Sequence, residues 1–301
     1  MSCYLFAHFI GESYEHGEQI YFSVSEDGLH WQDLNGGEPV LRSPLGELGV
    51  RDPFVVKHPG TGRYFMIATD LNIYRLRDWG KAVTCGSRDL IVWESDDLVN
   101  WSEPRSCTVG VPGAGNVWAP EAIWDEEKQA FMVFFASMIK LEGDAAPKQR
   151  IYAVYTEDFR NYTPAEVYAE AENHLIDMTI VRENGWYYRF TKDETTKMII
   201  ADRMRRLSDQ PERIHSATLA NLPGVEGPEC YQLSDGSWCL IVDQFHTGKG
   251  YLPMVTPTLE ACDFRILSDS EYNMGKTRKR HGGGIEITRE ERQRMQQAYG
   301  C

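Results

Sequence analysis

Five short segments of the sequence place an ionisable side chain near the start of a strand-like apolar run. In order they are GVRDPFVV with Asp52, VWAPEAIW with Glu121, LIDMTIV with Asp177, GVEGPECYQL with Glu226, and RHGGGIEI with His281. Successive anchors are 69, 56, 49 and 55 residues apart, so each is predicted to lie at the same point of its repeat. Charged groups inside apolar strands cost free energy unless they are paired or perform a function. The pattern predicts that these five side chains converge on one site.

Several carboxyl groups around one pocket suit the hydrolysis of a glycosidic bond. One carboxylate activates a water molecule on one face of the sugar, while a protonated carboxylic acid donates to the leaving oxygen on the other face. Crowded carboxyl groups push each other's pKa values apart, which keeps one of them protonated near neutral pH. The competing interpretation is structural: turn caps or salt bridges between neighbouring repeats. It is strongest for Glu121.

A second repeated feature predicts the strands that position these side chains. Aromatic-rich runs follow charged or glycine-containing turns, at 63–70, 130–137, 186–193 and 237–244. Apolar runs of this length between turn residues indicate strands joined by tight hairpins. A Ser/Thr-x-Asp motif before an aromatic residue recurs at 25–31, 94–101 and 155–162, and more loosely at 260–267. Its aspartate is expected to cap a turn through the local backbone.

Repeats of about 50 residues built from short antiparallel strands predict an all-β fold, a five-bladed β-propeller. The innermost strand of each blade lines the channel, and the five anchor segments fit that place. We expect the ring to close with residues 280–288 as the inner strand of the last blade and the N-terminal runs 5–11 and 19–31 as its outer strands. Helical periodicity is confined to 288–301, so residues 1–301 are predicted to form one catalytic domain with a short C-terminal helix.

Composition narrows the classes of partner and site that this chain is expected to have. The net charge of −14, from 31 basic and 45 acidic residues, would repel phosphate backbones and argues against nucleic acid. No stretch approaches the roughly 18 apolar residues of a membrane span, and no signal-peptide pattern precedes residue 18, so a cytoplasmic location is predicted. The 7 cysteines are scattered without a CxxC pair, which argues against a disulfide framework and a zinc site.

The motifs resemble those of glycoside hydrolase family 43 over residues 48–290. The most specific pieces are the Asp-Pro at Asp52, the Ile-Asp at Asp177 and the Glu-Gly-Pro at Glu226. The resemblance implies a five-bladed propeller that hydrolyses with inversion of configuration. It implies Asp52 as general base, Asp177 as the residue that orients the acid and adjusts its pKa, and Glu226 as general acid.

The resemblance also implies supporting roles for two further anchors. Glu121 replaces the aspartate of the family's Ala-Pro-Asp segment and is expected on the pocket wall. His281 is similar to a family histidine near the channel centre, which implies either a bound calcium ion or a plain hydrogen-bonding histidine. No cofactor is otherwise required.

The substrate class follows from the resemblance: pentose residues of oligosaccharides derived from plant polysaccharide, cleaved by an α-L-arabinofuranosidase or a β-xylosidase. Sugar rings stack on aromatic side chains, for which Trp118 and Phe245 are the candidates. Arg51 and Arg280 are candidates to bond sugar hydroxyls, with bridging between blades as the alternative. Competing functions are a non-catalytic carbohydrate-binding propeller, a phosphorolytic enzyme, and a retaining invertase-like fructosidase. The last needs an N-terminal Asn-Asp-Pro motif that residues 1–50 lack.

Overall fold

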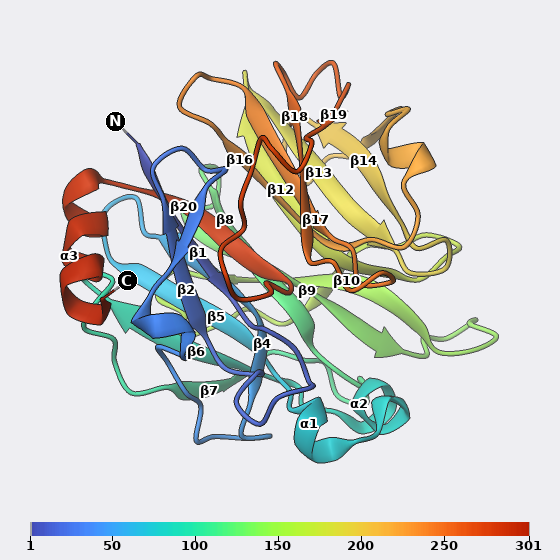
Figure 1. Ribbon diagram of the computed structural model, residues 1–301. Coiled ribbons are helices and arrows are strands. Elements are labelled where there is room, and N and C mark those ends of the chain that lie inside the picture. Colours follow the sequence, from blue (N-terminus) through green and yellow to red (C-terminus); the bar gives the residue numbers. More distant parts are fainter. Residues whose placement is uncertain (1, 301) are drawn as a thin grey trace.

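Five four-stranded antiparallel sheets surround a central channel like the blades of a propeller (Figure 1). The structure is a computed structural model that describes residues 2–300. Each sheet contributes its innermost strand to the channel, and each innermost strand contacts those of the neighbouring blades. The predicted all-β, five-bladed propeller is confirmed.

Four of the blades follow chain order from the channel outward. The first contains β4 (Val50–Lys57), β5 (Tyr64–Asp70), β6 (Asp89–Ser95) and β7 (Arg105–Thr108). The second contains β8 (Trp118–Asp125), β9 (Ala130–Ile139), β10 (Lys148–Thr156) and β11 (Glu166–Ala169). The third contains β12 (Leu175–Glu183), β13 (Trp186–Asp193), β14 (Met198–Met204) and β15 (Glu212–Ile214). The fourth contains β16 (Glu226–Gln232), β17 (Trp238–Asp243), β18 (Tyr251–Thr256) and β19 (Arg265–Ile266).

The last blade joins the two ends of the chain. Its inner strand is β20 (Gly282–Ile287), which pairs antiparallel with β1 (Cys3–His8). Next come β2 (Tyr21–Ser25) and β3 (Trp31–Asp33). The predicted closure of the ring by N-terminal strands on a C-terminal inner strand is confirmed.

Few helices interrupt the strands. Between β5 and β6 an insertion carries α1 (Ile73–Leu76) and α2 (Trp79–Cys85), and η1 (Asn35–Gly37) and η2 (Leu219–Asn221) are single 3₁₀ turns. α3 (Arg289–Tyr299) lies within the predicted range 288–301 and begins with a capping box. None of the helices within residues 2–300 has the length and apolarity needed to cross a membrane.

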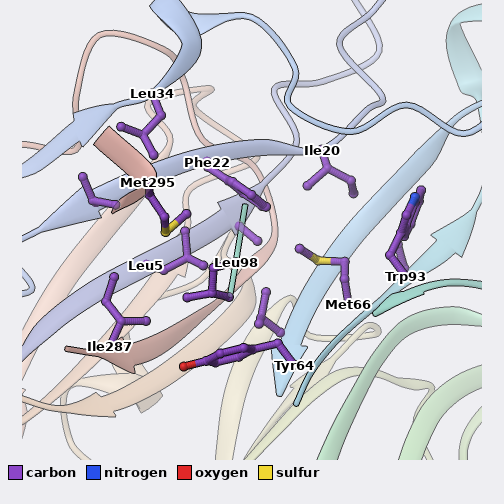
Figure 2. Close-up of a cluster of buried hydrophobic side chains, with 14 of the residues drawn as sticks. Leu5, Ile20, Phe22, Leu34, Tyr64, Met66, Trp93, Leu98, Ile287 and Met295 are labelled. Carbon is purple, nitrogen blue, oxygen red and sulfur yellow. The ribbon is translucent and has the colours of Figure 1, made fainter. Parts of the chain in front are cut away.

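The core lies between the blades because both faces of the middle strands are covered. β5 and β9 are buried along nearly their whole length, as their aromatic-rich sequences predict. The core between the last blade and the first blade extends to the C-terminal helix α3, where Met295 lies beside Leu5 and Phe22 (Figure 2).

The recurring aspartates cap turns as predicted in three of the four segments, and within the described part of the chain no such hydrogen bond is seen for Asp263 of the looser segment 260–267. The carboxylates of Asp27, Asp97 and Asp158 each accept hydrogen bonds from backbone N–H groups two and three residues later.

Candidate active site

A β-bulge interrupts each of the inner strands β4, β8, β12 and β16 near its first residues. At each bulge one residue adopts a left-handed backbone: Asp52 (φ 49°), Ala119 (φ 48°), Asp177 (φ 48°) and Gly227 (φ 51°). Left-handed non-glycine residues are uncommon, and bulges redirect side chains at functional sites. These four residues are therefore the structurally equivalent positions of the four strands.

The bulges correct the predicted equivalence of the four acids. Asp52 and Asp177 occupy the equivalent position, but Glu226 lies one residue before it and Glu121 two residues after it. Spacing along the chain misses such offsets because blades differ in loop length, and a shift of one residue turns a side chain to the other face of a strand.

The consequence is largest for Glu121, which does not line the pocket where we expected it. Its side chain is buried in the channel. Burial raises the pKa of Glu121 well above its usual range, and the nearby charge of Glu229 raises it further. Glu121 is thus a buried carboxyl outside the pocket.

The remaining predicted residues do meet. A cavity of about 600 Å³ opens where the inner strands begin. Its lining includes the predicted acids, the predicted sugar-binding side chains and the histidine: Asp52, Asp177, Glu226, Arg51, Trp118, Phe245, Arg280 and His281. The cavity is large enough for a small saccharide.

Asp52 is oriented by its neighbour on β5. Thr69 donates its hydroxyl hydrogen to Oδ2 of Asp52 at 2.8 Å, and the same hydroxyl accepts from the backbone N–H of Ala119 at 2.8 Å. Nδ1 of His281 lies 3.5 Å from the other oxygen of Asp52. The carboxyl group is thereby fixed at the wall of the cavity.

Asp177 is the most deeply buried of the three predicted catalytic acids. The backbone N–H of Gly227 donates to its Oδ2 at 3.1 Å, and Nδ1 of His281 lies 3.7 Å from its Oδ1. Burial raises the pKa of Asp177 to about 6, although the charges of His281 and Lys192 oppose the shift. Glycine is required at 227, because a Cβ there would lie 2.8 Å from the ring of His281. His281 thus lies between Asp52 and Asp177.

Glu226 has a different environment because each of its oxygens meets a cation. Nη2 of Arg280 lies 2.7 Å from Oε1, and Nζ of Lys192 lies 2.7 Å from Oε2. Burial alone would raise the pKa of Glu226, but Lys192 and then Arg280 outweigh it and lower the pKa to about 2. The two cations therefore favour the ionised form of Glu226.

The two predicted arginines both line the cavity and bridge blades. Arg51 bonds Glu18, in the β1–β2 connection, at 2.9 Å. Arg280 bonds Asp243 of β17 at 2.5 Å as well as Glu226. The bridging of blades is confirmed for both arginines, and the bonding of sugar hydroxyls stays a prediction.

Two residues that were not predicted from the sequence, Lys192 and Trp79, also line the cavity. Lys192 had a readable signal, since it is a cation inside the aromatic run WYYRFTKD. Trp79 had none, because it belongs to the α1–α2 insertion, which breaks the repeat. The ring of Trp79 meets that of Trp118 at 6.1 Å and 85°, and the Arg51 guanidinium lies 5.0 Å from its centroid.

Trp79 is 44% exposed at the cavity, which makes it a surface for a sugar ring. We expect Trp79→Ala to raise KM for an oligosaccharide about tenfold, equivalent to about 1.4 kcal/mol, with a smaller effect on kcat. Trp186→Ala is the matched control, since Trp186 packs against Arg203 and Arg205 outside this cavity. Steady-state kinetics of both variants test the expectation. It would be contradicted if Trp79→Ala and Trp186→Ala changed KM by the same factor.

His281 is the residue for which the sequence left two roles open, a bound calcium ion or a plain hydrogen bond. Calcium takes six to eight oxygen ligands. Within residues 2–300 there is no group of three or more His, Cys, Asp or Glu side chains that could hold a metal. Nδ1 of His281 lies 3.5 Å from Asp52 and 3.7 Å from Asp177, and a calcium ion beside it stays a prediction.

Known proteins resemble this chain over most of its length. A family described as a probable glycosyl hydrolase domain matches residues 1–293. An α-L-arabinofuranosidase of Bifidobacterium longum subsp. longum is 33% identical over 197 residues, which are 59% of this chain and 18% of that protein. The chain therefore spans less than a fifth of the length of this curated relative.

Solved structures show the same fold at low identity. A putative exo-β-1,3-galactanase from Bifidobacterium bifidum s17 superposes with a TM-score of 0.61 at 15% identity, over 92% of this chain and 91% of that chain. A thermostable family-43 glycoside hydrolase superposes with a TM-score of 0.53 at 18% identity, over 76% of this chain and 75% of that chain. With the family match, these results show that the chain belongs to the probable glycosyl hydrolase domains related to glycoside hydrolase family 43.

Proposed function

We propose that the chain is an inverting glycoside hydrolase that removes pentose residues from oligosaccharides derived from plant polysaccharide. The observation that supports it most is the meeting of Asp52, Asp177 and Glu226 in one cavity, each with different partners. L-Arabinofuranose is our first choice of sugar because the matched relative is an α-L-arabinofuranosidase. β-Xylose is the second.

The proposed mechanism divides the work among these acids. Asp52, held by Thr69, takes a proton from water as the water attacks the anomeric carbon. Glu226 gives a proton to the leaving oxygen, so the glycosidic bond breaks while the new bond forms on the opposite face. Asp177 accepts a hydrogen bond from the backbone N–H of Gly227, the residue after Glu226, and so helps to position the acid.

We propose that the reaction needs no cofactor and takes place in the cytoplasm. Two carboxyl groups supply the acid and the base, so the scheme contains no step that a metal must perform. The six described cysteines are free, which is typical of a reducing compartment, and Cys301 lies outside the described residues.

The stereochemistry of the product tests the proposal. We expect the first-formed sugar to have the anomeric configuration opposite to that of the substrate, because water attacks directly. The measurement is proton NMR during cleavage of para-nitrophenyl α-L-arabinofuranoside and β-D-xyloside, in buffer containing EDTA. Retention would indicate a fructosidase-like covalent mechanism, a requirement for phosphate would indicate phosphorolysis, and binding without cleavage would indicate a carbohydrate-binding propeller.

A further inference from the structure

The environment of Glu226 conflicts with the task of a general acid. An acid must carry a proton to donate it, yet both oxygens of Glu226 are occupied by cations at 2.7 Å. The free protein therefore holds Glu226 as a carboxylate. Catalysis by this residue requires that one of the two cations release it when the sugar binds.

Arg280 is poorly suited to release Glu226. Its guanidinium is anchored by Asp243 at 2.5 Å and faces Glu12 at 3.6 Å. A guanidinium remains charged and keeps its planar geometry, so it stays where several acids fix it. The other charged groups that act on Glu226 are Lys192 from β13, Asp177 from β12 and Asp243 from β17.

Lys192 is suited to the release because it already has a second acidic partner. Its Nζ lies 2.6 Å from Oε2 of Glu194, a residue that immediately follows β13. The Lys192 side chain is 2% exposed, and its ammonium lies 4.6 Å from the ring centroid of Phe245 at the cavity wall. An ammonium group has three donors that rotate together. It can leave one carboxylate for a sugar hydroxyl and keep the other.

We propose that Lys192 is a positioning residue that holds Glu226 ionised in the free enzyme and, when a sugar enters, releases it while remaining paired with Glu194. Glu226 then takes a proton from solvent and passes it to the leaving oxygen, while the proton of the attacking water goes to Asp52. This inference rests on the proposed role of Glu226 as the acid.

The pH dependence of the wild-type enzyme gives the first test. kcat/KM reports the ionisation of the free enzyme, whereas kcat reports that of the substrate complex. Because Lys192 holds Glu226 ionised only before binding, we expect the alkaline limb of kcat/KM to lie at lower pH than that of kcat. Coinciding limbs would overturn the inference.

Variants of the lysine give the second test. Lys192→Met removes the charge and keeps an unbranched apolar side chain, so the alkaline limb of kcat/KM should rise by about one to three pH units. Lys192→Arg keeps the charge and should not produce this rise. Glu194→Gln, at a partly exposed position, should shift the alkaline limb of the kcat profile to lower pH, since Lys192 then has Glu226 as its main partner.

The matched control is Lys197→Met. Lys197 pairs with the same Glu194, but it is 41% exposed and does not line the cavity. Lys197→Met should leave the alkaline limbs of kcat/KM and kcat at the pH of the wild type. A Lys192→Met profile that superimposes on that of the wild type would mean a purely structural role, and Glu194→Gln still decides the matter if Lys192→Met does not fold.

The two proposals can fail separately. If Glu226→Gln retains full activity, the proposed catalytic role is wrong. If Glu226→Gln is inactive while Lys192→Met and Glu194→Gln leave the pH profile unchanged, only the role of Lys192 is wrong.

Discussion

Glu226→Gln is expected to lower kcat/KM by about 10²–10⁴-fold for substrates whose leaving oxygen needs a proton. Activated aryl glycosides should lose much less, because a phenolate with a low pKa leaves without protonation. The measurement is a series of aryl pentosides with leaving groups of increasing pKa. A steep dependence in the variant and a shallow one in the wild type would identify Glu226 as the acid.

Glu121→Gln is the matched control for this variant. The raised pKa of Glu121 favours its neutral form, to which glutamine is similar in shape and charge. We expect activity close to that of the wild type. Glu226→Gln also leaves Lys192 and Arg280 with a neutral partner, so thermal denaturation must show that the variant is folded. A uniform loss across all leaving groups would contradict the acid role.

Asp52→Asn should show the opposite pattern. Loss of the base is expected to lower kcat by about 10²–10⁴-fold for every leaving group alike, because activation of water is impaired whichever bond breaks. Asparagine keeps a carbonyl oxygen that can accept the Thr69 hydroxyl, so local geometry should survive. Kinetics with the same aryl series make the comparison.

Added azide tests this base role further. Azide is already an anion and needs no base, so it should restore turnover of activated substrates in Asp52→Asn and yield a glycosyl azide of inverted configuration. Asp158→Asn is the control, since Asp158 caps a turn outside the cavity. If added azide left the turnover of Asp52→Asn unchanged, the assignment of Asp52 as the general base would be refuted.

The fold was predictable because its signals are local. Hairpin turns and aromatic runs predicted the second strand of four blades, and an unmatched N-terminal strand pair predicted the partners of β20. These features depend on neighbouring residues in the sequence, and the repeat multiplies the signal.

The site was less predictable because it depends on where a backbone leaves regular geometry. Asp52 and Asp177 occupy the left-handed bulge position, which is uncommon for residues other than glycine, and no sequence rule marks it. Glu121 was therefore misplaced by spacing alone. Lys192 is a cation inside an apolar run, which marks it as unusual, but the sequence does not name its partner: Glu226 belongs to the next blade, and the packing of the two blades brings them together.

The pairing of β20 with β1 has a consequence for synthesis of the chain. Four blades can form from residues 50–267 as the ribosome extends the polypeptide, but Arg280 and His281 complete the cavity only after the last inner strand has been made. A nascent chain would therefore lack the complete cavity until β20 pairs with β1. Proteolytic trimming of the first strand should silence the enzyme as surely as loss of a carboxylate, since β20 would lose its partner.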